Sequence, residues 1–145
     1  MEDFKTKLYT SYDKLTTTQK TDVVDFLHTH LDQFGDSRSS ITKAVDYAMA
    51  NNDSPGGFVL TATDDKDIVG TVVVNKTGME GYIPENILVY IAVHKDYRGK
   101  GLGKLLMKNA LKVSDGNVAL HVEPDNPAKF LYEKLGFENK YLEMR

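Results

Sequence analysis

Three glycines alternate with other residues in one short segment, and cationic side chains accompany them. The glycines stand at 99, 101 and 103, before an apolar pattern with helical spacing. Glycine lets an anion approach the main chain where a Cβ would collide, and a helix start adds free N–H groups and positive dipole charge. Lysine and arginine add charge-assisted hydrogen bonds. We therefore expect a phosphate ester to bind the segment Arg98, Gly99, Lys100, Gly101, Leu102, Gly103 and Lys104.

Two other phosphate-binding motifs fit this segment less well. A Walker A loop needs Ser or Thr after its Gly-Lys pair to hold Mg²⁺, but Leu105 follows Gly103-Lys104. A dinucleotide fingerprint needs a third glycine three residues after the second, where this chain has Lys104 after Gly101. The spacing therefore disfavours both a nucleoside triphosphatase and a dinucleotide-binding enzyme.

The remaining reactive residue types give no metal site or covalent nucleophile. The sequence has no Cys, which excludes disulfides, thiolate ligands and a Cys nucleophile, and fits a reducing cytosol. His28 and His30 are two residues apart on a predicted helix and so face different directions. His94 and His121 lack a second histidine at metal-binding spacing. We expect no metal.

Composition indicates one globular domain over residues 1–145. Hydrophobic residues make up 41% of the chain and charged residues 27%, enough to build a core. The formal charge of −3 provides no cationic field for nucleic acid or an anionic membrane surface. No apolar run reaches about 18 residues. We expect a cytoplasmic protein that neither binds nucleic acid nor enters a membrane.

The N-terminal third predicts a strand and two helices. Residues 4–10 alternate weakly and fit an edge strand. Thr16 and Gln19 have capping-box spacing and predict a helix over about 17–33. A second helix, capped by a serine within 37–40, carries an apolar stripe that ends near Asn51-Asn52.

The rest of the chain predicts a mixed α/β sheet. A hairpin, a nearly all-apolar central strand, a helix of about 13 residues after the glycines, another strand and a last helix follow in order. Pro127 after Asn126 fits the start of the last helix, which ends at Gly136. The predicted strands lie at 58–63, 68–74, 87–93, 118–122 and 137–145, with a loop at 75–84.

Two motifs in this order resemble the GNAT superfamily of N-acetyltransferases. The first is Ile91-Ala92-Val93 leading into Asp96-Tyr97-Arg98-Gly99-Lys100-Gly101-Leu102-Gly103, and the second is Asn126-Pro127-Ala128 with Tyr132-Glu133-Lys134-Leu135-Gly136-Phe137. The match runs from Ile87 to Phe137, and the preceding helices and hairpin fit the same layout. The resemblance implies a mostly antiparallel central sheet, splayed between its fourth and fifth strands, with two N-terminal helices and two further helices.

The resemblance also implies an acyltransferase that moves the acetyl group of acetyl-CoA to a primary amine by direct attack. The pantetheine arm would lie between the splayed strands against Ile91, Ala92 and Val93, with main-chain groups of the first and third in contact. The N–H near Val93 would stabilise the oxyanion. Asn126 would lie near the pantetheine, and Tyr132 would protonate the departing CoA sulfur. Because no peptide-docking segment stands out, we expect a small-molecule acceptor.

The sequence departs from this family in its general base. Many relatives carry a carboxylate in the middle of the central strand, where this chain has Val89 and Tyr90. We expect Glu85, just before that strand, to be the base, acting through water that Tyr90 or His121 orders. The missing strand carboxylate also leaves an alternative open, a non-catalytic acyl-CoA-binding sensor or interaction module.

The second departure lies at the C-terminal side. Relatives often finish with two strands, and the nine residues after Gly136 are too few for both. The acceptor pocket would then be open or completed by another subunit. A homodimer is compatible with this arrangement.

Overall fold

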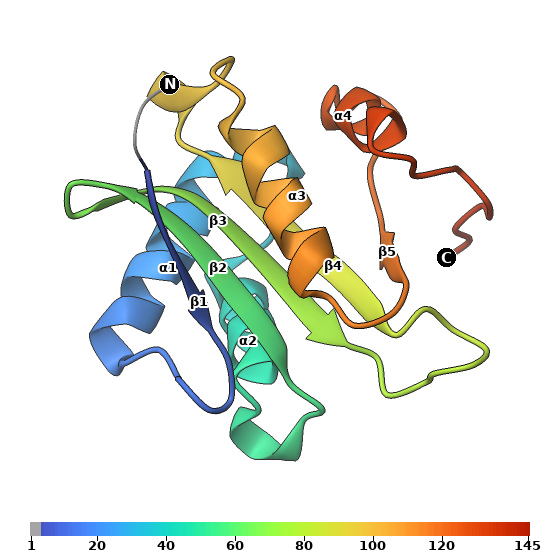
Figure 1. The fold of residues 1–145 in the computed structure, drawn as a ribbon, viewed down its shortest axis with the longest axis horizontal. Coiled ribbons are helices and arrows are strands. Elements are labelled where there is room, and N and C mark those ends of the chain that lie inside the picture. The colour runs from blue at the N-terminus through green and yellow to red at the C-terminus, as the bar shows by residue number, and fades with distance from the viewer. Residues whose placement is uncertain (1–3) are drawn as a thin grey trace.

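The computed structural model describes residues 4–145 and contains one five-stranded sheet (Figure 1). The strands stand in chain order, and every neighbouring pair is antiparallel except the last, which is parallel. This arrangement confirms the predicted mixed α/β sheet, its edge strand and its hairpin. The strands are β1 (Lys5–Tyr9), β2 (Gly57–Asp64), β3 (Asp67–Lys76), β4 (Asn86–Val93) and β5 (Val118–Leu120).

Four α-helices accompany the sheet, and local side-chain caps start the first two. Thr16 and Gln19 form the predicted capping box, and the Ser37 hydroxyl accepts the N–H of Ser40. The first helix is shorter than predicted, because Asp32 adopts φ +54° and residues 32–34 form a 3₁₀ turn instead. The helices are α1 (Thr17–His30), α2 (Arg38–Ala48), α3 (Leu102–Val113) and α4 (Ala128–Lys134).

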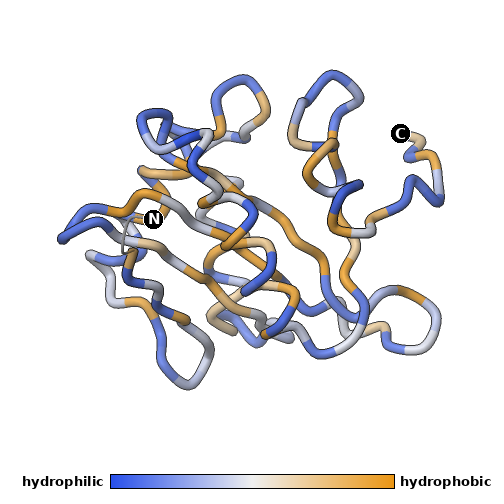
Figure 2. The backbone as a smooth tube through the Cα atoms, turned by 45° about the horizontal axis from the view of Figure 1, so that its top comes forward, coloured by the Kyte–Doolittle hydropathy of each residue, from blue (hydrophilic) through white to orange (hydrophobic). Residues whose placement is uncertain are grey.

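The sheet is covered on both faces. Helices α1 and α2 lie behind it in Figure 1, and α3 crosses its front. Figure 2 shows hydrophobic residues running along the central strands, with hydrophilic residues at the turns. The core is thus divided by the sheet into one cluster under α1 and α2 and another under α3 and α4. None of the helices in residues 4–145 has the length and apolar character needed to cross a bilayer.

A β-bulge interrupts β4 in its middle. Val73 of β3 pairs with Tyr90 and Val74 pairs with Leu88, so Val89 is the extra residue. As a result Val89 and Tyr90 both face α1 and α2, whereas Leu88 and Ile91 face α3. The bulge therefore re-aims the second half of the strand.

Strands β4 and β5 pair along only three residues and then part. The parallel register runs from Asn86 opposite Val118 to Leu88 opposite Leu120, so β5 is shorter than the predicted 118–122. Beyond Leu88 the edge of β4 faces no strand in the described structure. This is the splay expected between the fourth and fifth strands.

The strand predicted at 137–145 is wrong. Residues 135–145 contain no regular element, and Tyr141, Leu142 and Met144 are more than four-fifths exposed. A strand at this edge would have to pair with β5, which offers only three residues. So few ladder bonds, without apolar burial, do not offset the entropy of ordering the segment.

Candidate active site

The free edge of β4 presents main-chain groups in the splay. The N–H of His94 bonds the carbonyl of Val69 on β3 at 2.8 Å. Because main-chain groups alternate along an antiparallel strand, those of Ala92 also face β3, and those of Ile91 and Val93 point to the opposite edge. The main-chain groups of Ile91 and Val93 are therefore directed at the gap between β4 and β5, and a contact of Ile91, Ala92 or Val93 with a ligand stays a prediction.

The glycine turn forms an open cradle at the start of α3. Gly99 and Gly101 have φ of +79° and +83°, a region that favours glycine, and Gly101 directly precedes the helix. No side chain caps the first turn of α3. A Cβ added at either glycine would meet no atom within 4 Å. The turn therefore combines unoccupied space with the free N–H groups of a 12-residue helix, which suits a diphosphate.

The strand end, the glycine turn and the last helix converge at Gly103. A Cβ at this position would lie 3.7 Å from Val93 Cγ2 and 3.7 Å from Leu131 Cδ2. Leu102, 2% exposed, anchors the first turn of α3 in the core. Val93 and Leu131, 38 positions apart in the chain, are thereby brought to one place, and Tyr132 is the next residue of α4.

The charge of Arg98 is directed away from the cradle, contrary to expectation. Its guanidinium donates to the carbonyl oxygens of Val93 and His30 and pairs with Asp32 at 3.0 Å. These bonds tie the turn to the end of α1. The contact of Arg98 with a phosphate stays a prediction.

The two predicted lysines remain near the glycine turn. Lys100 stands over the Tyr97 ring, with Nζ 5.3 Å from the centroid, and Lys104 is exposed in the first turn of α3. Both side chains place positive charge near the glycine turn, which follows the last residue of β4.

Tyr132 projects from α4 into the second core cluster. It is 7% exposed and packs edge-to-face on Phe137 with centroids 6.2 Å apart. Burial raises the pKa of its hydroxyl. Within residues 4–145 no group hydrogen-bonds that hydroxyl. The side chain is thus a protonated donor in the cluster against which Ile91 and Val93 pack.

Asn126 stabilises the start of α4. Its side-chain oxygen accepts the N–H of Ala128 at 2.9 Å, and the helix begins at Ala128, one residue later than Pro127. The capping role is therefore local, and a contact between Asn126 and the pantetheine stays a prediction.

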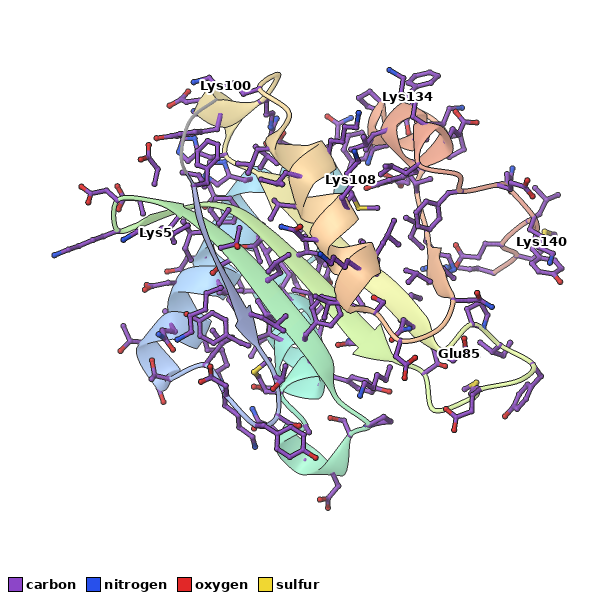
Figure 3. The ribbon with its side chains drawn as sticks, in the orientation of Figure 1. Lys5, Glu85, Lys100, Lys108, Lys134 and Lys140 are labelled. Carbon is purple, nitrogen blue, oxygen red and sulfur yellow. The ribbon has the colours of Figure 1, made fainter. Side chains whose placement is uncertain are left out.

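Glu85, the expected general base, is engaged by the turn that precedes β5. Its carboxylate accepts the N–H of Asn117 at 2.7 Å, and this bond is the main cause that lowers the pKa of the Glu85 carboxyl. Glu85 lies at the start of β4, at the opposite end from Lys100 (Figure 3). A carboxylate stabilised in its charged form is a weaker proton acceptor. Glu85 instead holds the turn between α3 and β5.

A carboxylate that the sequence did not indicate reaches the bulged part of β4. The Tyr90 hydroxyl donates to Asp36 Oδ2 at 2.5 Å, across 54 residues of sequence. Burial, the hydrogen bond and the negative charge of Asp36 all raise the pKa of Tyr90. His121, the other residue expected to order water, is exposed, 3.9 Å from Glu143.

A separate hollow of about 360 Å³ lies between α1 and the β2–β3 turn. Its lining includes Asp22, Phe26, His30, Lys66 and His94, and none of the predicted site residues. Among residues 4–145 no group of three His, Asp or Glu is placed to hold a metal ion. The convergence at Gly103 is therefore the better candidate site.

Comparison with known proteins identifies the family. The family model described as an acetyltransferase (GNAT) domain matches residues 55–139, more than half of the chain. N-alpha-acetyltransferase 30 of Schizosaccharomyces pombe is 29% identical over 85 residues, which cover 55% of this chain and 57% of that protein. The chain thus matches little more than half of this relative's length.

Solved structures share the fold. A GNAT-family acetyltransferase of Streptococcus pneumoniae superposes with a TM-score of 0.70 at 18% identity, covering 99% of this chain and 96% of that one. Diaminobutyrate acetyltransferase of Paenibacillus lautus, solved with its substrate and coenzyme A, gives a TM-score of 0.61 at 16% identity, covering 92% and 74%. The chain belongs to the GNAT acetyltransferase family.

Proposed function

We propose that this protein transfers the acetyl group of acetyl-CoA to a primary amine by direct attack, without a covalent enzyme intermediate. The observation that carries the proposal is the convergence at Gly103 of a splayed strand edge, an open glycine cradle and the helix of Tyr132. The cradle suits a diphosphate, the free edge suits an amide-bearing arm, and Tyr132 suits a leaving thiolate. Membership in an acetyltransferase family supports the same reaction.

Each part of the site has a defined role in this proposal. Main-chain N–H groups at Gly99, Gly101 and the start of α3 hold the diphosphate, helped by Lys100 and Lys104. Main-chain groups of Ile91 hold the pantetheine arm, and the N–H of Val93 is directed at the thioester carbonyl. Bound acetyl-CoA supplies the activated acyl group.

Two groups act on the charges that develop during the reaction. The N–H of Val93 points to the free edge of β4 and stabilises the oxyanion formed when the amine attacks. Tyr132 gives its proton to the sulfur as the carbon–sulfur bond breaks. Its raised pKa keeps it protonated until that step.

The names of two similar proteins support an amine as the acceptor. One relative is named for alpha-amino groups and one fold neighbour for a small diamine. We therefore propose a screen of peptide amino termini, free amino acids and diamines, and we expect the small amines to turn over first.

The cofactor site is tested by titrating acetyl-CoA calorimetrically into wild type, Gly101→Glu and Gly81→Glu. Both glycines have positive φ and open space around a would-be Cβ, so both substitutions carry equal backbone strain. Only Gly101→Glu places bulk and negative charge in the cradle. We expect micromolar binding in wild type and Gly81→Glu and at least a tenfold loss, about 1.4 kcal/mol, in Gly101→Glu. No binding to wild type would refute the proposal.

A second function, a non-catalytic acyl-CoA-binding module, is favoured by one observation. The middle of β4 has no carboxylate, and Glu85 is engaged with Asn117. Release of free thiol from acetyl-CoA across the amine screen separates the two functions. Binding without amine-dependent thiol release would establish the module.

A further inference from the structure

The pair Tyr90–Asp36 occupies the place where the strand carboxylate is missing. Tyr90 follows the bulge at Val89 and lies two residues beyond Leu88, where β5 stops pairing. Its side chain leaves the sheet on the α1–α2 face and ends on Asp36 at 2.5 Å. The pair thus runs from the opening of the splay to the segment between α1 and α2.

We propose that Tyr90 and Asp36 form the proton relay that deprotonates the acceptor amine, a role that rests on the acetyl transfer proposed above. Tyr90 is the catalytic residue that touches the amine. Asp36 is the terminal proton acceptor.

The difference in burial between Tyr90 and Asp36 fits these two roles. Tyr90 is 8% exposed, whereas Asp36 is exposed and can exchange a proton with water. A buried tyrosine whose pKa is raised stays protonated, so it can pass a proton along but is a poor base alone. Asp36 accepts the proton, and the Tyr90 hydroxyl connects Asp36 with the strand.

Few other charges face the pair. Arg145 of the C-terminal segment lies close enough to Asp36 for the two to interact electrostatically, and it also bonds Glu143 at 2.7 Å. On the segments flanking Asp36, Asp32 pairs with Arg98 and Arg38 pairs with Asp25. Asp36 thus remains the carboxylate that faces Tyr90.

Each proton in the relay has a defined donor and acceptor. An acceptor ammonium gives one proton to Tyr90 Oη while the proton of Tyr90 passes to Asp36 Oδ2, and Asp36 releases it to water. The neutral amine forms its bond to the acetyl carbon, and the carbon–sulfur bond breaks. The amine then loses a second proton, which replaces the one that Tyr132 has given to sulfur. The products are the amide, CoA thiol and one released proton.

The test measures thiol release from acetyl-CoA with two small amines. Methylamine is an ammonium ion at pH 7 and needs deprotonation, whereas hydroxylamine is largely neutral and does not. The variants are Asp36→Asn, Tyr90→Phe and the double variant. Asp64→Asn is the matched control, since Asp64 accepts a 2.6 Å bond from Tyr97 elsewhere on the sheet. Calorimetric binding of acetyl-CoA verifies that each variant is folded.

With methylamine we expect each single variant to lose about 100-fold in rate at pH 7, and the double variant to lose no more, because the two residues act as a unit. With hydroxylamine each should lose less than about threefold. Between pH 7 and 9, kcat/KM for methylamine should be constant in wild type. In Asp36→Asn it should rise roughly tenfold per pH unit, because the variant uses only the unprotonated amine. Asp64→Asn should behave as wild type.

Several results would overturn the relay. Equal losses with both amines would mean that Asp36 acts on structure alone, and no loss would exclude it from the reaction. If wild type binds acetyl-CoA but acetylates neither amine, the relay is refuted. A wild type that fails to bind acetyl-CoA refutes the proposed function itself, which the titration reports separately.

Discussion

Arg98 Nε donates a 3.0 Å hydrogen bond to the carbonyl oxygen of Val93, so this arginine of the glycine motif binds the end of β4. The same guanidinium bonds His30 and Asp32, which joins the cofactor turn to the end of α1. One side chain thereby connects the end of β4, the glycine turn and the end of α1.

Replacing Arg98 by Lys should weaken both stability and cofactor binding. Lysine keeps the charge but lacks the planar fork that bonds three groups at once. We expect unfolding free energy to fall by about 1 kcal/mol and the melting temperature by about 2–4 °C, with weaker acetyl-CoA binding. Arg38→Lys is the control, because its exposed pair with Asp25 contributes little. An equal loss in both variants would contradict the linking role.

Tyr132→Phe should remove turnover and leave binding intact. Its hydroxyl has no hydrogen-bond partner among residues 4–145, so its loss should not reduce the melting temperature. We expect kcat to fall about 100-fold and the acetyl-CoA dissociation constant to stay within about twofold. Tyr141→Phe, at an 82% exposed position, should change neither. Unchanged turnover in Tyr132→Phe would exclude it as the thiolate acid.

Glu85→Gln should affect stability and not chemistry. The lowered pKa means that the unfolded chain binds the Glu85 proton first as pH falls. The stability from Glu85 is therefore present above its unfolded pKa near 4.5 and is lost as pH drops through the lower folded value.

Urea unfolding from pH 7 to 3 should show a gap between wild type and Glu85→Gln that closes below about pH 4.5. Glu80→Gln in the exposed loop should show no such gap. Thiol release should stay within about twofold in Glu85→Gln. A 100-fold loss would restore Glu85 as the general base.

His30 should make the protein sensitive to mild acid. Burial lowers the pKa of its imidazole, as do His94 and Arg98, and its ring stacks on His94 with centroids 4.3 Å apart. The unfolded chain takes up the proton first, so stability falls as pH drops below about 6.5 and levels off below the folded pKa.

His30→Phe keeps an aromatic ring in the stack and removes the titration. The fall in melting temperature between pH 7.5 and 5.5 should therefore be smaller than in wild type. His28→Phe, at an exposed position of the same helix, should keep the wild-type fall. An unchanged fall in His30→Phe would show that another group senses the acid.

Elements with local causes could be predicted from the residues alone. Thr16 with Gln19 and Ser37 start their helices through bonds to groups three residues away. Gly99 and Gly101 mark positions of positive φ because only glycine adopts them at low cost. Apolar periodicity indicated the hairpin, the central strand and α3. These are the features from which the fold and the cradle were predicted.

Features that depend on distant partners could not be predicted in this way. Arg98 bonds the His30 carbonyl and the Asp32 carboxylate, and Glu85 accepts an N–H from a residue 32 positions away. The bulge at Val89 and the short β5 follow from register with neighbouring strands. The hydrogen bond between Tyr90 and Asp36 joins residues 54 positions apart. Sequence periodicity does not indicate such a contact, because packing of the whole core brings the two segments together.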